Sequence, residues 1–496
     1  PCLHLPPAPA RLRLRATKQR GKDFVVRREI RTLPGDKFSR TLLIRSQREI
    51  AQLNFFDQEK IKIDPIPNPE DGTVDINYGV EEKSSDQLEL SAGWGGFIGL
   101  TGTLGVTFNN FSSKNIFQKA AWDPLPIGDG QKLSVRVQSN GKAFRSTNLS
   151  FTEPWLGGKR PVQFSTSLSH TKQFLYDYQT RNADKSKSFN ITGITLGLAR
   201  RLSVPDDYFT LSQAVSFQRY DLNNYNTGLF TFGDGYANNL SYTVGLNRNN
   251  TYNDPIYPTG GSNFDVRLKL SAPYSVFSKV DYTALKEERD GLLIIRDDVS
   301  QNPIDRTNAS SRIGEIDQER YKWLEFYKIN FKADWYTQVA KDLVLRPSAE
   351  FGFLGAYNND RGVIPFERFF VGGDGIAQFQ LDGRESIGLR GYENNRLSSA
   401  EGGTIFNKFQ MELRFSITDS PSASIYTLGF LEAGNSYDNF ETFNPFELKR
   451  SAGLGVRIFM PAFGLLGIDF AHGFDPLPGL REKSGWQTHF IIGRQF

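Results

Sequence analysis

The chain has 496 residues, a net charge of +4, 46 glycines, 40 phenylalanines and a mean hydropathy of −0.44. Its single cysteine, Cys2, excludes an internal disulfide framework and a thiolate metal site. The small positive excess lies within residues 1–83 among acidic residues, which indicates a solvated surface and not a nucleic-acid footprint. No apolar run approaches the ~20 residues of a transmembrane helix, whereas a barrel strand needs only ~10 residues with every second one apolar.

Residues 11–84 have the pattern of a small α+β domain. We expect a strand at 11–15, helices at 23–32 and from Ser39 onward, and strands at 60–66 and 73–82. This order of strand, helix, helix, strand and strand makes a module of about the smallest size that folds alone. Residues 1–10 match neither this module nor a signal peptide, so they stay unassigned and indicate a truncated or partly resolved chain.

The remainder, residues 85–496, repeats the two-residue period of strands with one apolar and one polar face. In segment 406–417, Phe409, Met411 and Leu413 alternate with Gln410 and Glu412. We count about sixteen such segments, an even number as a closed antiparallel barrel of this class requires. Their cores begin near Gln87, Gly99, Leu133, Phe144, Val162, Phe189, Phe209, Leu240, Ser262, Tyr327, Leu343, Phe406, Ile425, Ser451, Leu465 and Trp486. Repetition and length favour a mainly β chain with a 16-stranded antiparallel transmembrane β-barrel over a sandwich.

The first and last strands of such a barrel meet at its closing seam. The first is Gln87, Leu88, Glu89, Leu90, Ser91, Ala92, Gly93 and Trp94, and the last is His489, Phe490, Ile491, Ile492, Gly493, Arg494, Gln495 and Phe496. In the last strand, Phe490 falls on the lipid face and His489 on the lumen face. Because the last strand is short and contains Gly493, few ladder bonds hold the seam, and we predict a lateral gate there. Parting the seam exposes unpaired backbone groups along a strand edge, and an incoming strand of another protein, which we call a client, can form hydrogen bonds with them.

Two connections, 273–322 and 357–404, are far longer than the others, and long connections in such barrels lie outside the cell or fold inward. The charged first one indicates water exposure, and its role stays open. The second carries the motif Gly388, Leu389, Arg390, Gly391 and Tyr392. Its glycines permit close backbone approach, so the arginine can enter a crowded lumen, where its charge needs partners. Glu412 and Glu432 lie on polar faces of neighbouring strands and are the candidate partners.

From about residue 20 onward, the chain resembles the BamA family of outer-membrane assembly factors. The loop motif and the preceding segment 365–373 match the inward loop of that family. Other matching segments follow in the same order, namely 151–155, 257–262, 430–434 and 493–496. The ordered combination is specific, although each piece alone is weak.

The resemblance implies that Arg390 pairs with acidic residues at the positions of Glu412 and Glu432, and that residues 11–84 form the last of several POTRA domains. It implies a central subunit of an outer-membrane β-barrel assembly machinery in a Gram-negative bacterium, with the POTRA domain in the periplasm. The implied partners are nascent outer-membrane proteins, accessory Bam-type lipoproteins, surface-exposed subunits and the lipid bilayer. POTRA domains of the family recruit extended clients by strand addition.

Enzymatic functions lack support in the sequence. The four histidines show no metal-ligand spacing, and we find no phosphate loop or nucleophile elbow, so we expect no catalysis, no metal and no cofactor. The alternatives are a two-partner-type polypeptide secretion pore, whose relatives share the POTRA-linked barrel and arginine loop, and a TamA-type assembly factor.

Overall fold

The structure is a computed structural model. It describes residues 13–16, 23–53, 56–57, 60–70, 72–82, 86–94, 100–119, 122, 125–158, 160–177, 179–180, 182–225, 231–251, 256–374, 384–420, 423–460 and 464–494. The unassigned segment 1–10 and the last two residues of the predicted closing strand, Gln495 and Phe496, lie outside these ranges. The chain divides into two compact units, of which the second holds 90–104, 137–148 and 167–496.

The amino-terminal module has the predicted element order. Its elements are β1 (Arg13–Ala16), α1 (Asp23–Arg27), α2 (Arg40–Gln52), β2 (Lys62–Asn68) and β3 (Thr73–Val80), and the sheet order is β1-β3-β2. β1 pairs with β3 in parallel, and β2 pairs with β3 in antiparallel orientation. The Ser39 side chain accepts the Leu42 backbone N–H and begins α2. Val25, Ile50 and Tyr78 belong to a buried core between the helices and the sheet.

The first helix is shorter than predicted. We expected it over 23–32, but α1 ends at Arg27 and the chain turns at 28–29. Leu33 precedes Pro34, and a residue before proline is disfavoured in the α region, so helical conformation does not extend up to the proline. The apolar residue Ile30 is still buried. The spacing of apolar residues therefore predicted the burial of Ile30 correctly, although its helical conformation was predicted wrongly.

Within the first unit, residues just after α1 contact two distant turns. Trp155 donates its indole N–H to Glu29 at 2.7 Å, and the Arg28 guanidinium lies 5.8 Å from the Trp155 ring centre. Arg28 also reaches the Asp129 backbone oxygen at 3.4 Å. Burial raises the pKa of the Glu29 carboxyl, and the Trp155 hydrogen bond and the Arg28 charge oppose that shift only in part.

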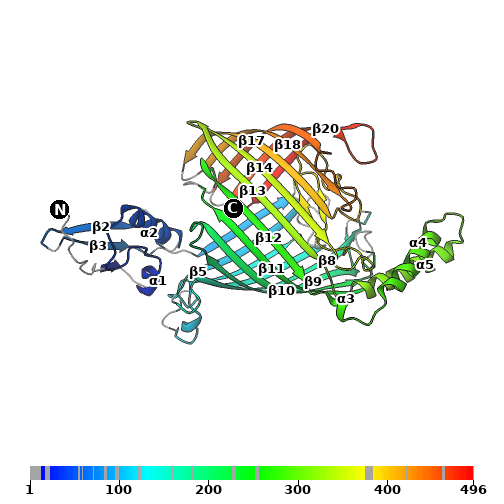
Figure 1. The fold of residues 1–496 in the computed structure, drawn as a ribbon, viewed down its shortest axis with the longest axis horizontal. Coiled ribbons are helices and arrows are strands. Elements are labelled where there is room, and N and C mark those ends of the chain that lie inside the picture. Colours follow the sequence, from blue (N-terminus) through cyan, green and yellow to red (C-terminus); the bar gives the residue numbers. More distant parts are fainter. Residues whose placement is uncertain are drawn as a thin grey trace. The chain divides into compact units, whose positions relative to one another are not determined.

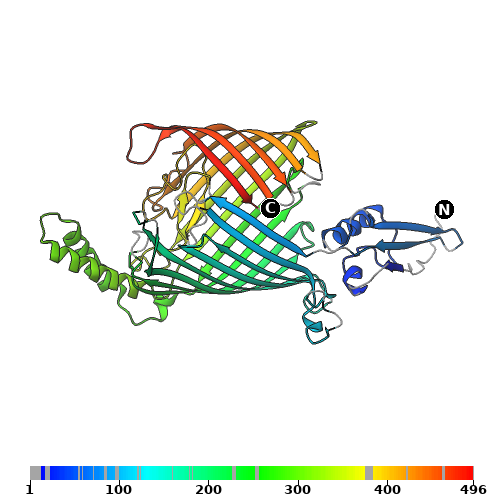
Figure 2. The ribbon, with the colours of Figure 1, turned by 180° about the vertical axis from the view of Figure 1, so that it is seen from behind.

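Sixteen strands form one large sheet, as predicted. They are β4 (Gln87–Trp94), β5 (Leu100–Phe111), β6 (Gln131–Ser139), β7 (Phe144–Glu153), β8 (Val162–Asp177), β9 (Asn182–Arg201), β10 (Phe209–Asn223), β11 (Gly235–Asn249), β12 (Gly260–Ser271), β13 (Tyr327–Ala340), β14 (Leu343–Gly355), β17 (Ile405–Ser420), β18 (Ala423–Tyr437), β19 (Lys449–Met460), β20 (Gly464–Pro476) and β21 (Lys483–Arg494). They follow one another in sequence order, from β4 at one end of the sheet to β21 at the other. In Figures 1 and 2 they run side by side in a tilted, curved wall.

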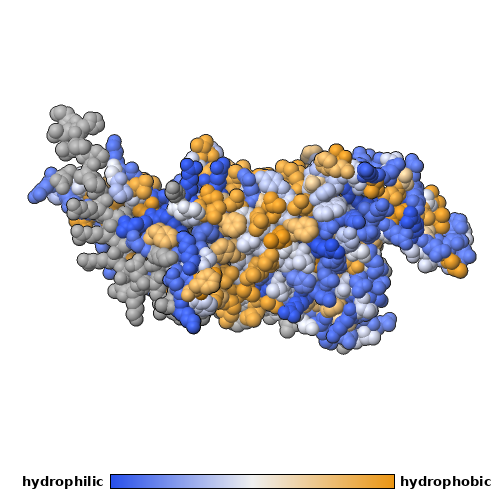
Figure 3. Space-filling view, turned by 90° about the horizontal axis from the view of Figure 1, so that it is seen from below, coloured by the Kyte–Doolittle hydropathy of each residue, from blue (hydrophilic) through white to orange (hydrophobic). Residues whose placement is uncertain are grey.

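The two faces of the sheet differ in chemistry, as the alternation predicted. On β17, Met411 and Leu413 are exposed, whereas Glu412 between them is buried. On β21, Phe490 is exposed and His489 is buried. Figure 3 shows apolar side chains gathered over the strands, with hydrophilic residues concentrated towards the strand ends from which α4 and α5 project. An apolar outer face and a polar inner face are typical of a barrel that meets lipid outside.

The long connection 273–322 is largely helical. It contains α3 (Tyr274–Phe277), α4 (Tyr282–Asp297) and α5 (Pro303–Arg320), and Figure 1 shows α4 and α5 projecting from the strand ends. Asp281 accepts the Ala284 backbone N–H to begin α4, and Asn302 accepts that of Ile304 to begin α5. These helices were not predicted from the sequence, which indicated only a long, charged connection. Among the described residues, no helix is long and apolar enough to span a membrane.

Candidate functional site

The loop between β14 and β17 carries the motif around Arg390. It contains two short parallel strands, β15 (Phe369–Val371) and β16 (Glu385–Ile387). Its apolar residues Phe369, Val371, Leu389 and Tyr392 are fully or almost fully buried. The loop therefore packs against the inner wall of the sheet and is not a solvated surface loop.

Arg390 is surrounded by three carboxylates from three strands. Its guanidinium donates to Glu412 on β17 at 2.9 Å, to Glu432 on β18 at 2.7 Å, and to Asp469 on β20 at 3.1 Å. The Arg390 backbone N–H also donates to Glu432 at 2.7 Å, and the Phe430 ring centre lies 3.5 Å from the guanidinium carbon. With 6% of its surface exposed, Arg390 depends on these groups in place of water. The structure thus brings together Arg390, Glu412 and Glu432, the three residues that the sequence singled out.

Most of the charged residues around Arg390 were not predicted from the sequence. Arg457 donates to Asp469 at 2.6 and 2.8 Å. Arg346 joins Glu412 to Asp334, with contacts of 3.0 and 2.6 Å, and Arg414 donates to Glu412 at 2.6 Å. Arg414 and Asp469 each lie between two exposed apolar neighbours on an alternating strand, so the available signal was a charged residue between two outward apolar ones. Alternating positive and negative groups stabilise one another in this network.

Other groups of the loop tip contact the last strands. The Gly391 backbone N–H donates to Nε2 of His489 on β21 at 2.8 Å. The Tyr392 hydroxyl donates to the Arg450 backbone oxygen on β19 at 2.7 Å. We define the tip clamp as residues 390–392 with these partners. It contacts β17, β18, β19, β20 and β21, which are the five strands at one end of the sheet.

Gly391 is required by this geometry. Its φ of +87° lies in the left-handed region, and a Cβ there would lie 2.8 Å from the Ser451 Cβ and 3.0 Å from the Gly473 backbone nitrogen. Both conditions exclude an ordinary side chain. The close approach places the Gly391 N–H within reach of the last strand.

The opposite side of the loop is held mainly by apolar contacts. The Phe366 ring stacks on Tyr220 of β10 at 4.5 Å, and Phe369 packs against Phe406 of β17 at 4.8 Å. Phe366, Phe369 and Tyr220 belong to one buried cluster that also includes residues of β9 and β11. An ionic contact joins them, since Lys328 of β13 donates to Glu367 and pairs with Glu385 at 2.7 Å. We call this set the apolar anchorage of the loop.

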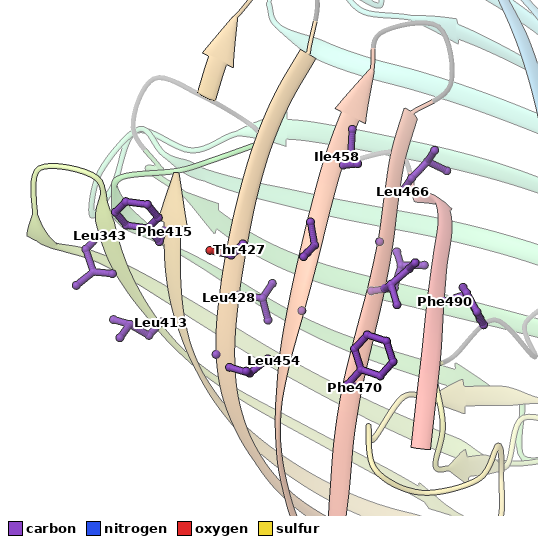
Figure 4. Close-up of a pocket in the computed structure, with 16 residues that line it drawn as sticks. Leu343, Leu413, Phe415, Thr427, Leu428, Leu454, Ile458, Leu466, Phe470 and Phe490 are labelled. Carbon is purple, nitrogen blue, oxygen red and sulfur yellow. The ribbon is translucent and has the colours of Figure 1, made fainter. Parts of the chain in front are cut away.

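Behind the tip clamp, the outer faces of the same strands form an apolar recess of about 960 Å³. Figure 4 shows Leu413, Phe415, Leu454, Phe470 and Phe490 around it, from strands β17 to β21. Thr427 supplies its only labelled polar side chain. An apolar recess on the outer face suits contact with hydrocarbon. The strands that hold the buried charges inside therefore present a lipid-compatible surface outside.

The predicted gate strands occupy the two ends of the sheet order, β4 and β21. Of their side chains, Leu88, Trp486 and Phe490 are exposed, and His489 is buried against the loop tip. Within the described ranges, no group of three or more His, Cys, Asp or Glu residues could hold a metal ion. The site offers a fixed array of ion pairs whose best-supported chemical role is to hold loop and strands in register.

Comparison with known proteins gives two family matches. The Omp85 superfamily domain matches residues 127–496. The POTRA family, described as a surface antigen variable number repeat, matches residues 17–83.

Curated relatives include two outer membrane protein assembly factors named BamA. That of Neisseria meningitidis is 24% identical over 434 residues, which cover 84% of this chain and 45% of the relative. That of Nitratidesulfovibrio vulgaris is 24% identical over 490 residues, with 96% and 50% covered. A putative outer membrane protein assembly factor of Treponema pallidum is 31% identical over 157 residues, with 31% and 17% covered. The chain thus spans about half or less of the length of these relatives.

Solved structures share the fold. BamA from Haemophilus ducreyi lacking POTRA domains 1–3 has a TM-score of 0.58 at 16% identity, with 97% of this chain and 84% of that chain covered. CdiB from Escherichia coli has a TM-score of 0.59 at 13% identity, with 97% and 75% covered. Since these scores are almost equal, fold likeness does not separate the two kinds of protein.

Proposed function

Because the chain belongs to the Omp85 superfamily and is of the BamA type, we propose that it acts as the central subunit of an outer-membrane β-barrel assembly machinery. In this proposal it folds and inserts outer-membrane proteins through a lateral gate between β4 and β21. Its partners are nascent outer-membrane proteins, the bilayer and accessory Bam-type lipoproteins. In this proposal the module at residues 11–84 lies in the periplasm and β4 runs outward. The connections that hold α4, α5 and the Arg390 loop follow β12 and β14, the ninth and eleventh strands counted from β4, so both face the outside.

The observation that carries the proposal is the tip clamp. One loop tip contacts all five strands at the β21 end of the sheet, through Arg390, Gly391 and Tyr392. A passive porin has no need to fix those strands to a single loop. An assembly factor does, because its terminal strand must leave β4 while the neighbouring strands keep their order for an arriving client. The secretion-pore alternative shares the arginine loop and is separated only by the experiment below.

His489 links the clamp to the terminal strand. Its partner is a backbone N–H, which can only donate, so the ring must offer an unprotonated Nε2. A single neutral hydrogen bond contributes only ~1 kcal/mol, far less than a set of charge-assisted bonds. The clamp holds β19 and β21 by one neutral hydrogen bond each, and of these two only β21 lies at the end of the sheet order, so we infer that β21 is the strand that can leave. β17, β18 and β20 stay fixed through Arg390 while β21 moves.

Gate opening needs no nucleotide in this mechanism. A client strand pairs with the exposed edge of β4, and hairpins accumulate until the client closes and leaves. In hydrocarbon, unpaired backbone groups cost several kcal/mol each, so pairing with a client replaces a costly edge with hydrogen bonds. The burial of lipid-facing side chains supplies further driving force.

Client capture by the amino-terminal module depends on its sheet edges. In the order β1-β3-β2, the two edge strands are β1 and β2. β2 contains Pro65 and Pro67, which lack the N–H that strand pairing uses. We therefore propose that extended clients add to the β1 edge.

The test is insertion of a radiolabelled outer-membrane barrel into proteoliposomes that hold this protein. Cys2 is first replaced by serine, and cysteine pairs are then placed on β4 and β21. Reductant-reversible loss of insertion after cross-linking supports the gate. A matched control pair across β19 and β20, at Val456 and Ile468, should not affect insertion, because these partners stay paired in the mechanism.

The same experiment separates the runner-up, a two-partner-type secretion pore. A pore would pass polypeptide through the lumen, and locking the seam would leave that passage intact. Undiminished insertion with a locked seam would contradict the lateral gate. A TamA-type assembly factor would give the same seam result as the main proposal, and the two would differ in their accessory partners.

A further inference from the structure

The short helix α3 presents two large apolar side chains to its surroundings. Val276 is 74% exposed and Phe277 is 80% exposed, although the neighbouring Ser275 is hydrogen-bonded to Glu325. Exposure of bulky apolar groups in water is unfavourable by ~25 cal/mol per Å². A rigid segment cannot turn such groups inward, so their surroundings decide whether the arrangement is stable.

Buried polar contacts hold α3 in position. Glu325 accepts the Ser275 backbone N–H at 2.7 Å and the Ser275 hydroxyl at 2.8 Å. Glu325 is 2% exposed and pairs with Arg361 at 2.7 Å. Arg361 also donates to the Arg320 backbone oxygen at 3.1 Å. These bonds fix α3 to the strand end at 325 and to the start of the Arg390 loop.

An aromatic row joins α3 to the outer face of the sheet. The Tyr274 ring centre lies 5.0 Å from that of Trp323, and Trp323 lies 6.4 Å from Phe217 on β10. Phe217 is paired in register with Ile194 and Leu240, and all three are exposed apolar residues on the outer face. α3 therefore continues the outer apolar surface from the row that contains Phe217, Ile194 and Leu240.

The next row along β10 is charged. Arg219 follows Phe217 on the same face and pairs with Asp221 at 2.8 Å. The Arg219 guanidinium and the Lys322 ammonium lie 4.3 and 5.7 Å from the Tyr236 ring centre. The change from Phe217 to Arg219 marks the level where hydrocarbon gives way to headgroups and water. Trp and Tyr side chains are enriched at that level.

We propose that α3 is an interfacial membrane anchor, in which Val276 and Phe277 enter the lipid at the border between acyl chains and headgroups. Continuity with the lipid-facing surface, through Tyr274 and Trp323, selects lipid as the occupant over a second copy of the chain or a protein partner. In the orientation proposed above, this is the outer leaflet. The anchor fixes the base of the α4–α5 hairpin at the membrane surface. Glu325 binds both α3 and Arg361, and because Arg361 belongs to the Arg390 loop, the position of α3 also restrains the start of that loop.

The test measures lipid contact at defined positions. The full chain with Cys2→Ser receives a single cysteine, carries an environment-sensitive nitrobenzoxadiazole dye there, and is reconstituted into dioleoylphosphatidylcholine vesicles with or without 5-doxyl phosphatidylcholine. The test variant is Phe277→Cys. The water control is Val299→Cys, which is 81% exposed between α4 and α5, and the lipid control is Leu196→Cys, which is 47% exposed on β9. Heat-modifiable migration on gels checks that each variant is folded.

The expected result is that the dye at 277 emits at shorter wavelength and is quenched by doxyl lipid several-fold more than the dye at 299, approaching the dye at 196. Equal quenching by aqueous iodide at 277 and 299, with no doxyl effect at 277, would overturn the proposal. Protection from iodide at 277 without doxyl quenching would also overturn it, and would assign α3 to a protein contact. The measurement needs no client insertion, so its outcome is independent of the assembly activity.

Discussion

The Arg390 loop is held on two sides by different physics. On the β17–β21 side, the tip clamp uses directed hydrogen bonds between buried charges. Away from the tip, the apolar anchorage uses mainly stacked rings and buried side chains, with partners on β9–β11 and at Phe406 of β17. Apolar burial is not directional and tolerates sliding, whereas an ion pair array is satisfied in one register only. The comparison indicates that the apolar side supplies much of the loop's affinity and that the clamp fixes strand register.

The largest effect is expected from Arg390→Ala. It leaves Glu412, Glu432 and Asp469 without their shared cation, and breaking a buried pair costs ~3–5 kcal/mol. We expect a lower urea midpoint of the barrel, measured by gel mobility, and loss of most client insertion. Arg390→Lys should rescue only in part, because a single ammonium does not reproduce the planar set of donors. Full insertion by Arg390→Ala would show that the clamp has no role in function.

Phe366→Ala tests the apolar side. Phe366 is 1% exposed, and removing a buried phenylalanine ring costs ~3–5 kcal/mol. We expect a stability loss at the lower end of that range, but more insertion than in Arg390→Ala at a temperature where both variants are folded. Phe446→Ala, at an 89% exposed position, is the matched control and should change neither quantity. If Phe366→Ala abolished insertion at a temperature where the variant is fully folded, the division of roles would be wrong.

His489→Leu should have a smaller effect that is confined to the last strand. It removes the acceptor of the Gly391 N–H, and a buried unsatisfied donor costs ~1–3 kcal/mol. We expect faster hydrogen exchange in β21 but not in β18. His489→Gln keeps a neutral acceptor and should restore protection. Acidification should loosen β21 in the wild type, because a protonated Nε2 cannot accept, while the Gln variant should not respond. Equal exchange in the wild type and the Leu variant would exclude the link.

The smallest effect on stability is expected at Glu29. This single carboxyl makes a buried polar contact in the first unit, in contrast to the network of several ion pairs around Arg390. Because its pKa is raised in the folded state, its contribution is fully present below the unfolded pKa and is lost as pH rises through the folded pKa. Glu29→Gln keeps the acceptor for Trp155 and does not titrate. The wild type should therefore lose stability relative to the variant as the pH rises above the ordinary glutamate range of about 4, as measured by thermal unfolding. A stability difference that is constant with pH would contradict the raised pKa.

Several elements could be predicted because they depend on local periodicity. The strand beginnings at Gln87, Phe144, Val162, Phe209, Tyr327 and Leu343 agree with the structure to the residue. Ser39 marked the start of α2, because a serine before a helical pattern is a recognisable cap. The helices in the connection 273–322 were missed, since long charged connections in barrels are usually read as loops and α3 has only four residues.

The site was predictable only in part. Arg390, Glu412 and Glu432 stood out through a motif and through inward positions on two strands. In the sequence, Asp469 lies 79 residues from Arg390, and His489 lies 98 residues from Gly391. No local pattern relates these partners.

The amino-acid sequence by itself determined the fold class, the strand alternation and the loop motif that holds Arg390, because these follow from a period of two and from a short motif. The tertiary structure alone decided which carboxylates share Arg390, that His489 receives the loop tip, and that α3 adjoins the outer apolar surface. Such contacts depend on the register and curvature of sixteen paired strands, which bring distant residues within hydrogen-bond distance.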